Sequence, residues 1–240
     1  MKPSLLLRIV ATLLLTCSCG PSESPDSKVF QIIGPDERTH ASHHYDELVG
    51  SLRFGDFHVC TAFLSAPNTV STATHCAPSR EDIHLYLFVT QNGTPIALTR
   101  RLTHANSAYV SFETAKPTSH YLEFATLNEN QPIELISYSE RYHDLRASRS
   151  GSFTTTPRGI LHKLDTEAGS SGSPLIQNGR VVGVHEGAVN GQELNYATRT
   201  IEVHTSHSNF DLQLDFEWKC NSQCSWYQPD CYIWKELNCS

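Results

Sequence analysis

Residues 169–176 read Gly-Ser-Ser-Gly-Ser-Pro-Leu-Ile, in which a serine stands among glycines directly before an apolar run. Acyl transfer needs a nucleophilic hydroxyl beside two backbone N–H groups that face the developing oxyanion. Glycines next to that serine let the backbone approach a substrate carbonyl closely. The stretch therefore indicates Ser171 as a nucleophile, although a loop that is merely rich in serine and glycine would read the same way.

A histidine that could serve as the base of this nucleophile lies upstream, in Thr-Ala-Thr-His-Cys at residues 72–76. Alone, His75 would also fit an ordinary half-buried histidine. Cys60 and Cys76 have fifteen residues between them, and a disulfide there would close the loop that carries His75. A loop of that length corresponds to a stabilisation of about 3 kcal/mol.

Short apolar runs rich in β-branched and aromatic residues recur between turn signals. They lie at residues 48–52, 57–59, 69–72, 85–89, 109–112, 133–136 and 181–184. Asn92-Gly93 and Asn178-Gly179 are typical of hairpin turns. No long segment has the helical period, and only a short helix near 200–208 fits the pattern. The sequence predicts an all-β protein, either a sandwich or a barrel.

Together these residues resemble the trypsin/chymotrypsin family of serine proteases, from Ile32 to about His207. The resemblance rests on the order and spacing of Ile32-Ile33-Gly34, residues 60–76, residues 169–174 and residues 182–185. It implies a protease domain over residues 32–209, built as two antiparallel six-stranded Greek-key β-barrels with the active site between them. It also implies a Cys60–Cys76 disulfide, and an oxyanion hole formed by the N–H groups of Gly169 and Ser171.

Within the family, the chain is most similar to the bacterial glutamyl endopeptidases. Residues 33–39, the Leu-Asp-Thr of residues 164–166 and the Gly-Val-His of residues 183–185 carry this likeness. It implies that His185 binds an acidic substrate side chain, in a pocket that Asp165 and Thr166 also line. Asp165 alternatively matches the residue with which trypsin selects lysine and arginine, but the glutamyl branch also has Asp-Thr there.

One catalytic position departs from the family pattern. The family's third catalytic residue is an aspartate, and the matching position here is Asn106. An amide cannot stabilise the imidazolium and favours the wrong tautomer, which costs a trypsin-type enzyme about four orders of magnitude in turnover. Glu186 follows His185 and, by the resemblance, lies beside the missing carboxylate. We therefore predict that Glu186 reaches the His75 ring directly, through Asn106 or through one water.

Two functions of different class follow. One is an exported serine endopeptidase that hydrolyses protein or peptide substrates through an acyl-enzyme, without a cofactor. The other is a catalytically impaired relative, a pseudoprotease that binds peptides in an intact cleft. Ser171 and His75 are both present, which favours the enzyme.

The first nineteen residues are typical of an export signal, with a positive start and an apolar run at residues 5–15. This run is too short to span a bilayer stably. Residues 16–20 read Thr-Cys-Ser-Cys-Gly and resemble the lipobox of bacterial lipoproteins. Lipidation of Cys19, or of Cys17 with a poorer fit, would attach the protein to a membrane. The alternative is ordinary secretion, and both place the protein outside the cytoplasm.

Residues 20–31 are rich in serine and proline and predict a flexible linker or propeptide. Apart from Cys17 and Cys19, the chain has six cysteines, an even number that predicts three disulfides in an exported protein. Four of the six lie in an aromatic-rich tail at residues 210–240, where three pairings are open. They are Cys220, Cys224, Cys231 and Cys239.

The formal net charge of −7 argues against nucleic acid as a partner, because phosphate binding needs clustered Lys and Arg. The thirteen histidines are scattered, with small groups at residues 40–44 and 204–207. No spacing of cysteine and histidine resembles a zinc site, so we expect exposed loops there and no metal. We expect the protein to act as a monomer.

Overall fold

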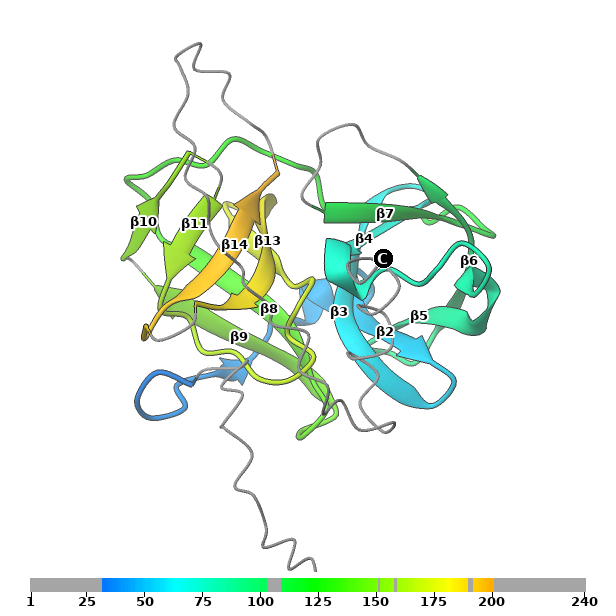
Figure 1. The fold of residues 1–240 in the computed structure, drawn as a ribbon, viewed down its shortest axis with the longest axis horizontal. Coiled ribbons are helices and arrows are strands. Elements are labelled where there is room, and N and C mark those ends of the chain that lie inside the picture. Colours follow the sequence, from blue (N-terminus) through cyan, green and yellow to red (C-terminus); the bar gives the residue numbers. More distant parts are fainter. Residues whose placement is uncertain (1–31, 103–108, 151, 158, 190–191, 201–240) are drawn as a thin grey trace, which may run out of the picture.

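The computed structural model in Figure 1 describes residues 32–102, 109–150, 152–157, 159–189 and 192–200. These residues form β-strands and turns, together with three single-turn 3-10 helices. The helices are η1 (His43–Tyr45), η2 (Thr74–Cys76) and η3 (Ile83–Leu85). The expected all-β class is confirmed. No helix in these ranges is long and apolar enough to cross a membrane. The predicted export signal, linker, short helix after residue 200 and cysteine-rich tail lie outside the described residues.

The first sheet is a closed antiparallel barrel, seen on the right of Figure 1. Its strands run in the order β2 (Val49–Phe54), β3 (Phe57–Ala66), β4 (Thr69–Ala73), β7 (Tyr109–Thr114), β6 (Pro95–Leu102) and β5 (Tyr86–Thr90). The barrel closes because β5 pairs with β2, for example Val89 with Ser51. Phe63, Phe88 and Phe112 are fully buried and form the centre of its core.

The second sheet has eight strands and curls around its own core on the left of Figure 1. Their order is β1 (Thr39–His40), β9 (Asp144–Ser150), β8 (Ile133–Ser139), β12 (Pro174–Gln177), β13 (Arg180–Ala188), β14 (Asn195–Arg199), β11 (Gly159–His162) and β10 (Phe153–Thr155). Among the described residues, no pairing joins the edge strands β1 and β10. A closed barrel beside a second curled sheet agrees with the predicted two-barrel architecture. The second unit differs from the prediction in one respect, because it is an eight-stranded curled sheet with two very short edge strands instead of a closed six-stranded barrel. Segments of two or three residues have too little periodicity to be predicted from sequence.

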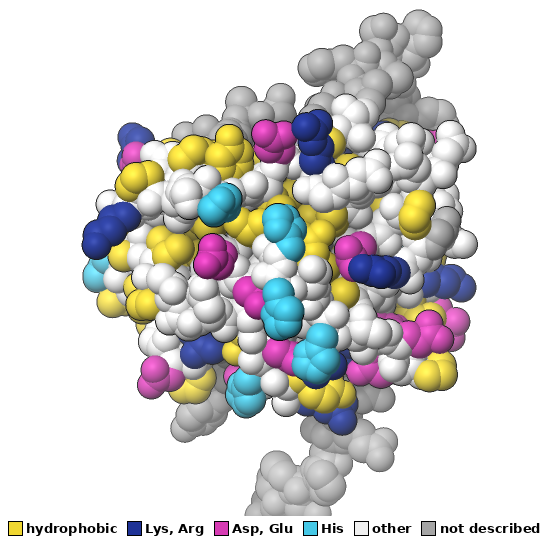
Figure 2. All heavy atoms as spheres, turned by 180° about the vertical axis from the view of Figure 1, so that it is seen from behind, with side chains coloured by type: hydrophobic (Ala, Val, Ile, Leu, Met, Phe, Trp, Pro, Cys, Tyr) yellow, Lys and Arg dark blue, Asp and Glu magenta, His cyan; other side chains and the backbone are white. Residues whose placement is uncertain are grey.

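Every apolar run that predicted a strand falls on one, with ends shifted by a few residues. Asn92-Gly93 and Asn178-Gly179 lie in the β5–β6 and β12–β13 turns, as expected. On the face opposite to Figure 1, the lysine and arginine side chains lie mostly singly, and histidines lie among acidic side chains down the middle (Figure 2).

One threonine of β3 connects the two sheets. The Thr61 N–H donates to the carbonyl of Ser171 over 2.9 Å, and the Thr61 hydroxyl donates to the carbonyl of Gly169 over 3.0 Å. The same hydroxyl accepts from the N–H of Tyr138 in β8 at 3.1 Å. The stretch around Ser171 is thus held against the first barrel, at the junction between the two sheets.

Candidate active site

Ser171 lies at the end of a tight turn that leads into β12. The Ser170 N–H donates to the carbonyl of Glu167 over 2.9 Å, and the Glu167 N–H donates back to the Ser170 hydroxyl over 3.0 Å. The next residue, Gly172, has a φ of 84°, which side chains rarely adopt. A Cβ at Gly172 would also overlap Thr72 of the first barrel. A glycine is required at position 172, directly after Ser171, for both reasons.

The expected oxyanion hole consists of two backbone donors. The N–H groups of Gly169 and Ser171 have no acceptor among the described residues. Gly169 has a φ of 84° and packs directly against the ring of His58, so that a Cβ would overlap it. Within the described residues, both N–H groups are therefore available to donate to a ligand oxygen without first breaking another hydrogen bond.

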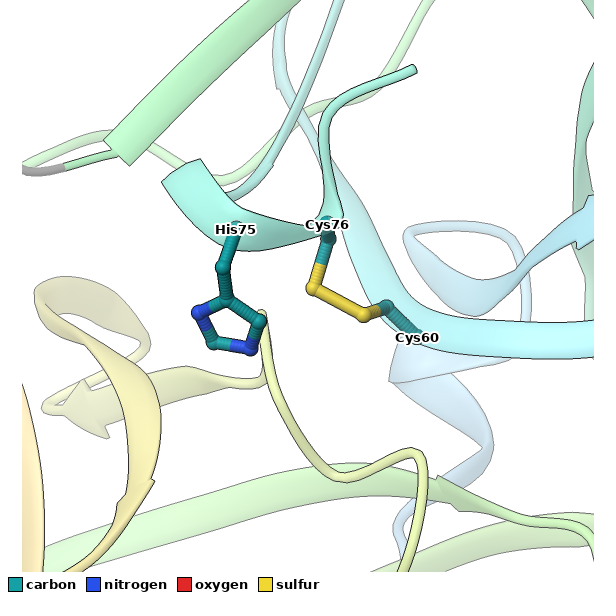
Figure 3. A group of neighbouring side chains, drawn as sticks. All are labelled: Cys60, His75 and Cys76. Atoms are coloured by element: carbon teal, nitrogen blue, oxygen red, sulfur yellow. A yellow bond between two sulfur atoms is a disulfide. The ribbon is translucent and has the colours of Figure 1, made fainter. Parts of the chain in front are cut away.

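His75 is held in place by η2, the helical turn that follows β4. The neighbouring Cys76 forms a disulfide with Cys60 of β3, with a Cα–Cα distance of 6.1 Å (Figure 3). The predicted Cys60–Cys76 bridge is thereby confirmed. Because it fastens η2 to β3, the histidine is fixed on the side of the first barrel that faces the second sheet.

Glu186 of β13 supplies a carboxylate to this histidine. Its Oε2 lies 3.1 Å from Nδ1 of His75, and its Oε1 accepts from the Thr198 hydroxyl at 3.3 Å. The pairing of β13 with β14 shifts between His185 and Gly187, so Glu186 is the extra residue of a β-bulge. Bulges redirect side chains beside active sites, and this one turns Glu186 toward the first barrel. The expected contact between Glu186 and the imidazole ring is present.

The Ser171 hydroxyl is bonded elsewhere in this structure. It donates to the backbone carbonyl of Glu186 over 2.9 Å and makes no hydrogen bond to His75. Catalytic hydrogen bonds are often long or misaligned without substrate. Asn106, which occupies the triad aspartate position in the sequence, lies outside the described residues.

His185, the residue expected to bind substrate, is completely buried. Its ring packs against that of His162, with centroids 5.4 Å apart, and the four ring nitrogens have no hydrogen-bond partner among the described residues. Burial lowers the pKa of His185, and it lowers the pKa of His162 to about 3. Both rings are therefore neutral near pH 7.

Asp165 is also buried, and its carboxylate faces the N-terminal segment. Oδ1 accepts the N–H of Ile33, and Oδ2 accepts the N–H of Glu37, each at 3.0 Å. Neither oxygen is left unpaired to select a basic substrate side chain. Thr166, the third expected pocket residue, is buried beside Asn195, whose side-chain oxygen accepts its hydroxyl at 3.4 Å.

Comparison with protein families matches residues 32–152 to the trypsin family. The chain belongs to the trypsin family. No curated protein sequence matches it significantly.

Several solved structures superpose on the chain. A Glu endopeptidase shares 20% identity and a TM-score of 0.60, covering 70% of this chain and 93% of the other. The active form of a protease from M. tuberculosis shares 19% identity and a TM-score of 0.54, covering 67% and 79%. Human heparin binding protein shares 14% identity and a TM-score of 0.57, covering 70% and 91%. Because all three identities are 20% or lower, these superpositions show a shared fold and nothing more.

One residue beside the candidate site was missed by sequence reasoning. Nδ1 of His58, in β3, shares a hydrogen bond of 2.7 Å with the Ser51 hydroxyl, and the His58 ring packs against Gly169. Burial lowers its pKa to about 4, so the ring is neutral. A single histidine in a strand has no motif around it, and its proximity to residue 169 arises only when the two sheets pack.

Cys60, His75 and Cys76 bring three potential metal ligands close together (Figure 3). Both sulfurs are consumed in the disulfide, so neither is a thiolate. These residues do not form a metal site in the oxidised protein.

Proposed function

We propose that this chain is a serine endopeptidase whose catalytic residues are Ser171, His75 and Glu186. The observation that carries the proposal is the 3.1 Å contact between His75 Nδ1 and Glu186 Oε2. A carboxylate at Nδ1 keeps the proton on that nitrogen, so Nε2 is free to accept the proton of Ser171. In this proposal, Glu186 of β13 orients His75 and stabilises its charged form, as the aspartate of the triad does in the trypsin family.

The reaction proceeds as acyl transfer. Ser171 Oγ attacks the scissile carbonyl while His75 takes its proton, and Glu186 stabilises the resulting imidazolium. The N–H groups of Gly169 and Ser171 donate to the oxyanion of the tetrahedral intermediate. The imidazolium then protonates the leaving amine, and water hydrolyses the acyl-enzyme by the same route. Before the first step, the Ser171 hydroxyl rotates away from the carbonyl of Glu186.

We further propose a preference for cleavage after glutamate. His185 and Thr166 match the glutamyl branch in sequence, and a Glu endopeptidase is among the solved structures that superpose on the chain. The carboxylate of Asp165 is engaged by two amides, which weakens its repulsion of an anionic substrate. A peptide library should show cleavage mainly after Glu and less after Asp. A profile dominated by Lys and Arg would reject this preference.

The test of the catalytic proposal is labelling with a fluorophosphonate probe. The native chain should be labelled, and Ser171→Ala should abolish labelling while the melting temperature stays unchanged. Labelling that persists in Ser171→Ala would exclude this nucleophile. A native protein that binds peptides but is neither labelled nor able to cleave them would be a pseudoprotease.

We propose that the protein is exported, with Cys19 or Cys17 lipidated or with free secretion. The Cys60–Cys76 disulfide supports this location, since such bonds persist in oxidising compartments. Cell fractionation of native protein and Cys19→Ser tests it. Loss of membrane association in the variant would support lipidation, and native protein in the cytoplasm would contradict export.

A further inference from the structure

The segment from Ile33 to Arg38 lies against the chain that leads to the nucleophile. Asp165, at the start of that chain, accepts the N–H groups of Ile33 and Glu37 at 3.0 Å each. Asp165 is almost completely buried, at 4% exposure. Both donors are internal backbone amides, so this contact needs no free amino terminus.

Arg38 adds a buried ionic contact at the end of the same segment. Its Nε and Nη2 each lie 2.9 Å from an oxygen of Asp36, and Nη2 lies 3.1 Å from Oε2 of Glu167. The Arg38 side chain is only 1% exposed. Removing one member of a buried ion pair leaves an uncompensated charge, so such a contact is costly to break. The hydrogen bonds from Arg38 lower the pKa of Asp36 to about 2, which keeps this group ionised.

Glu167 is the first residue of the turn that presents the catalytic groups. Its backbone carbonyl and N–H bond the N–H and hydroxyl of Ser170, as described above. Gly169 lies within this turn of residues 167–170, and Ser171 is the first residue after the turn. A displacement of Glu167 therefore moves both N–H groups of the oxyanion hole, and that hole depends on donor positions within a few tenths of an ångström.

We infer that Arg38 is a positioning residue for catalysis: by holding the Glu167 carboxylate, it fixes the 167–170 turn and with it the oxyanion-hole donors. This inference rests on the proposed serine-protease function. Arg38 touches neither the substrate nor the reacting atoms and acts only through Glu167.

The experiment compares Arg38→Met, Glu167→Gln and the double variant. The matched control is Arg146→Met, because Arg146 also forms a shielded ion pair, 2.8 Å from Asp144, and also lies over the ring of Tyr142. Turnover is measured as kcat and KM on the best library peptide, together with the fluorophosphonate labelling rate. Amide hydrogen exchange of the peptide that covers residues 167–173 reports on the turn independently of activity.

We expect Arg38→Met and Glu167→Gln each to lower kcat about 10- to 100-fold with KM nearly constant, less than the loss of a whole oxyanion-hole donor. The double variant should be no worse than Arg38→Met, because the two residues act in series. Exchange of residues 167–173 should accelerate in all three. Arg146→Met should lower the melting temperature and leave kcat within about twofold, since its ion pair does not reach the turn.

Additive losses in the double variant, or an unchanged exchange rate in Glu167→Gln, would overturn the inference. So would an equal loss of kcat in Arg146→Met, which would indicate a general effect on the second sheet. If the native protein shows no turnover and no labelling, the proposed function fails by itself. The exchange measurement then still decides whether Arg38 holds the turn.

Discussion

Replacing Glu186 with glutamine keeps the shape of the side chain and removes its negative charge. Native Glu186 lies 3.1 Å from His75 Nδ1, and the two side chains are 20% and 29% exposed. Two unit charges about 4 Å apart attract by about 4 kcal/mol at an effective dielectric constant of about 20, and by about 1 kcal/mol in water. These energies correspond to about a thousandfold and about fivefold in rate.

The limited exposure of the pair places the expected loss near the upper figure. The amide has a second effect, because its NH2 group can donate to Nδ1 and stabilise the tautomer whose Nε2 already carries a proton. We therefore expect Glu186→Gln to lower the rate of turnover about 10³- to 10⁴-fold, comparable to the aspartate-to-asparagine exchange in trypsin-type enzymes.

The assay is the second-order rate constant of fluorophosphonate labelling, supported by kcat on the best library peptide. Circular dichroism and the melting temperature establish that each variant is folded. Glu193→Gln is the control, because Glu193 is an exposed carboxylate between β13 and β14. It should label at the native rate.

A Glu186→Gln rate within about fivefold of native would refute the reasoning, since the carboxylate would then act as no more than a water-screened charge. Asn106→Ala should cost far less than Glu186→Gln. The opposite order would assign the role to Asn106. In a Glu186→Ser background, Asn106→Asp should raise activity, while beside native Glu186 the two carboxylates would compete for one site.

Three further predictions concern stability. Replacing Cys60 and its partner with alanine should lower the free energy of unfolding by about 3 kcal/mol, and equal urea midpoints for native and variant protein would contradict this. Burial lowers the pKa of His162 to about 3 and also lowers that of His185. The unfolded chain therefore binds more protons than the folded chain below about pH 6.5. Stability should fall as pH drops from there, by up to about 1.4 kcal/mol per pH unit for His162 down to about pH 3, and in the same direction for His185. Urea denaturation at pH 7 and pH 5 measures this, and an unchanged free energy would show that the rings are not buried and neutral. Gly172→Ala combines a left-handed φ with an overlap on Thr72, so we expect a loss of about 2 kcal/mol or more. A variant that melts at the native temperature would disprove the close approach.

Much of the fold could be predicted from the sequence because its signals are local. The strand β5 shows why, since it reads Tyr-Leu-Phe-Val-Thr, a short run of aromatic, apolar and β-branched residues that favours a strand without any information from the rest of the chain. The two Asn-Gly pairs predicted hairpin turns because the turn type depends on the conformation of those two residues alone. The strand β9 was missed because it reads Asp-Leu-Arg-Ala-Ser-Arg-Ser, in which few residues are apolar. Its pairing with β8 gives it an extended structure that its composition does not favour.

The candidate site also has a part that the sequence could predict and a part that it could not. Ser171, His75 and the Cys60–Cys76 bridge were predictable, because each lies in a short motif whose chemistry is recognisable from neighbouring residues. The resemblance to a family brought Glu186 near His75, but residue types alone could not say which way its side chain turns.

By itself, the sequence determined the all-β class, predicted the Cys60–Cys76 disulfide, and indicated Ser171 and His75 as candidate nucleophile and base. Only the tertiary structure decided what the carboxylates do. The bulge in β13 turned Glu186 toward an imidazole 111 residues away in the chain. Asp165, which the sequence left with two roles in substrate selection, instead binds backbone amides 128 and 132 residues away. A buried carboxylate binds whichever donors the packing of the two sheets brings to it, because an unpaired charge in the interior costs several kcal/mol, and no pattern of neighbouring residues encodes those donors.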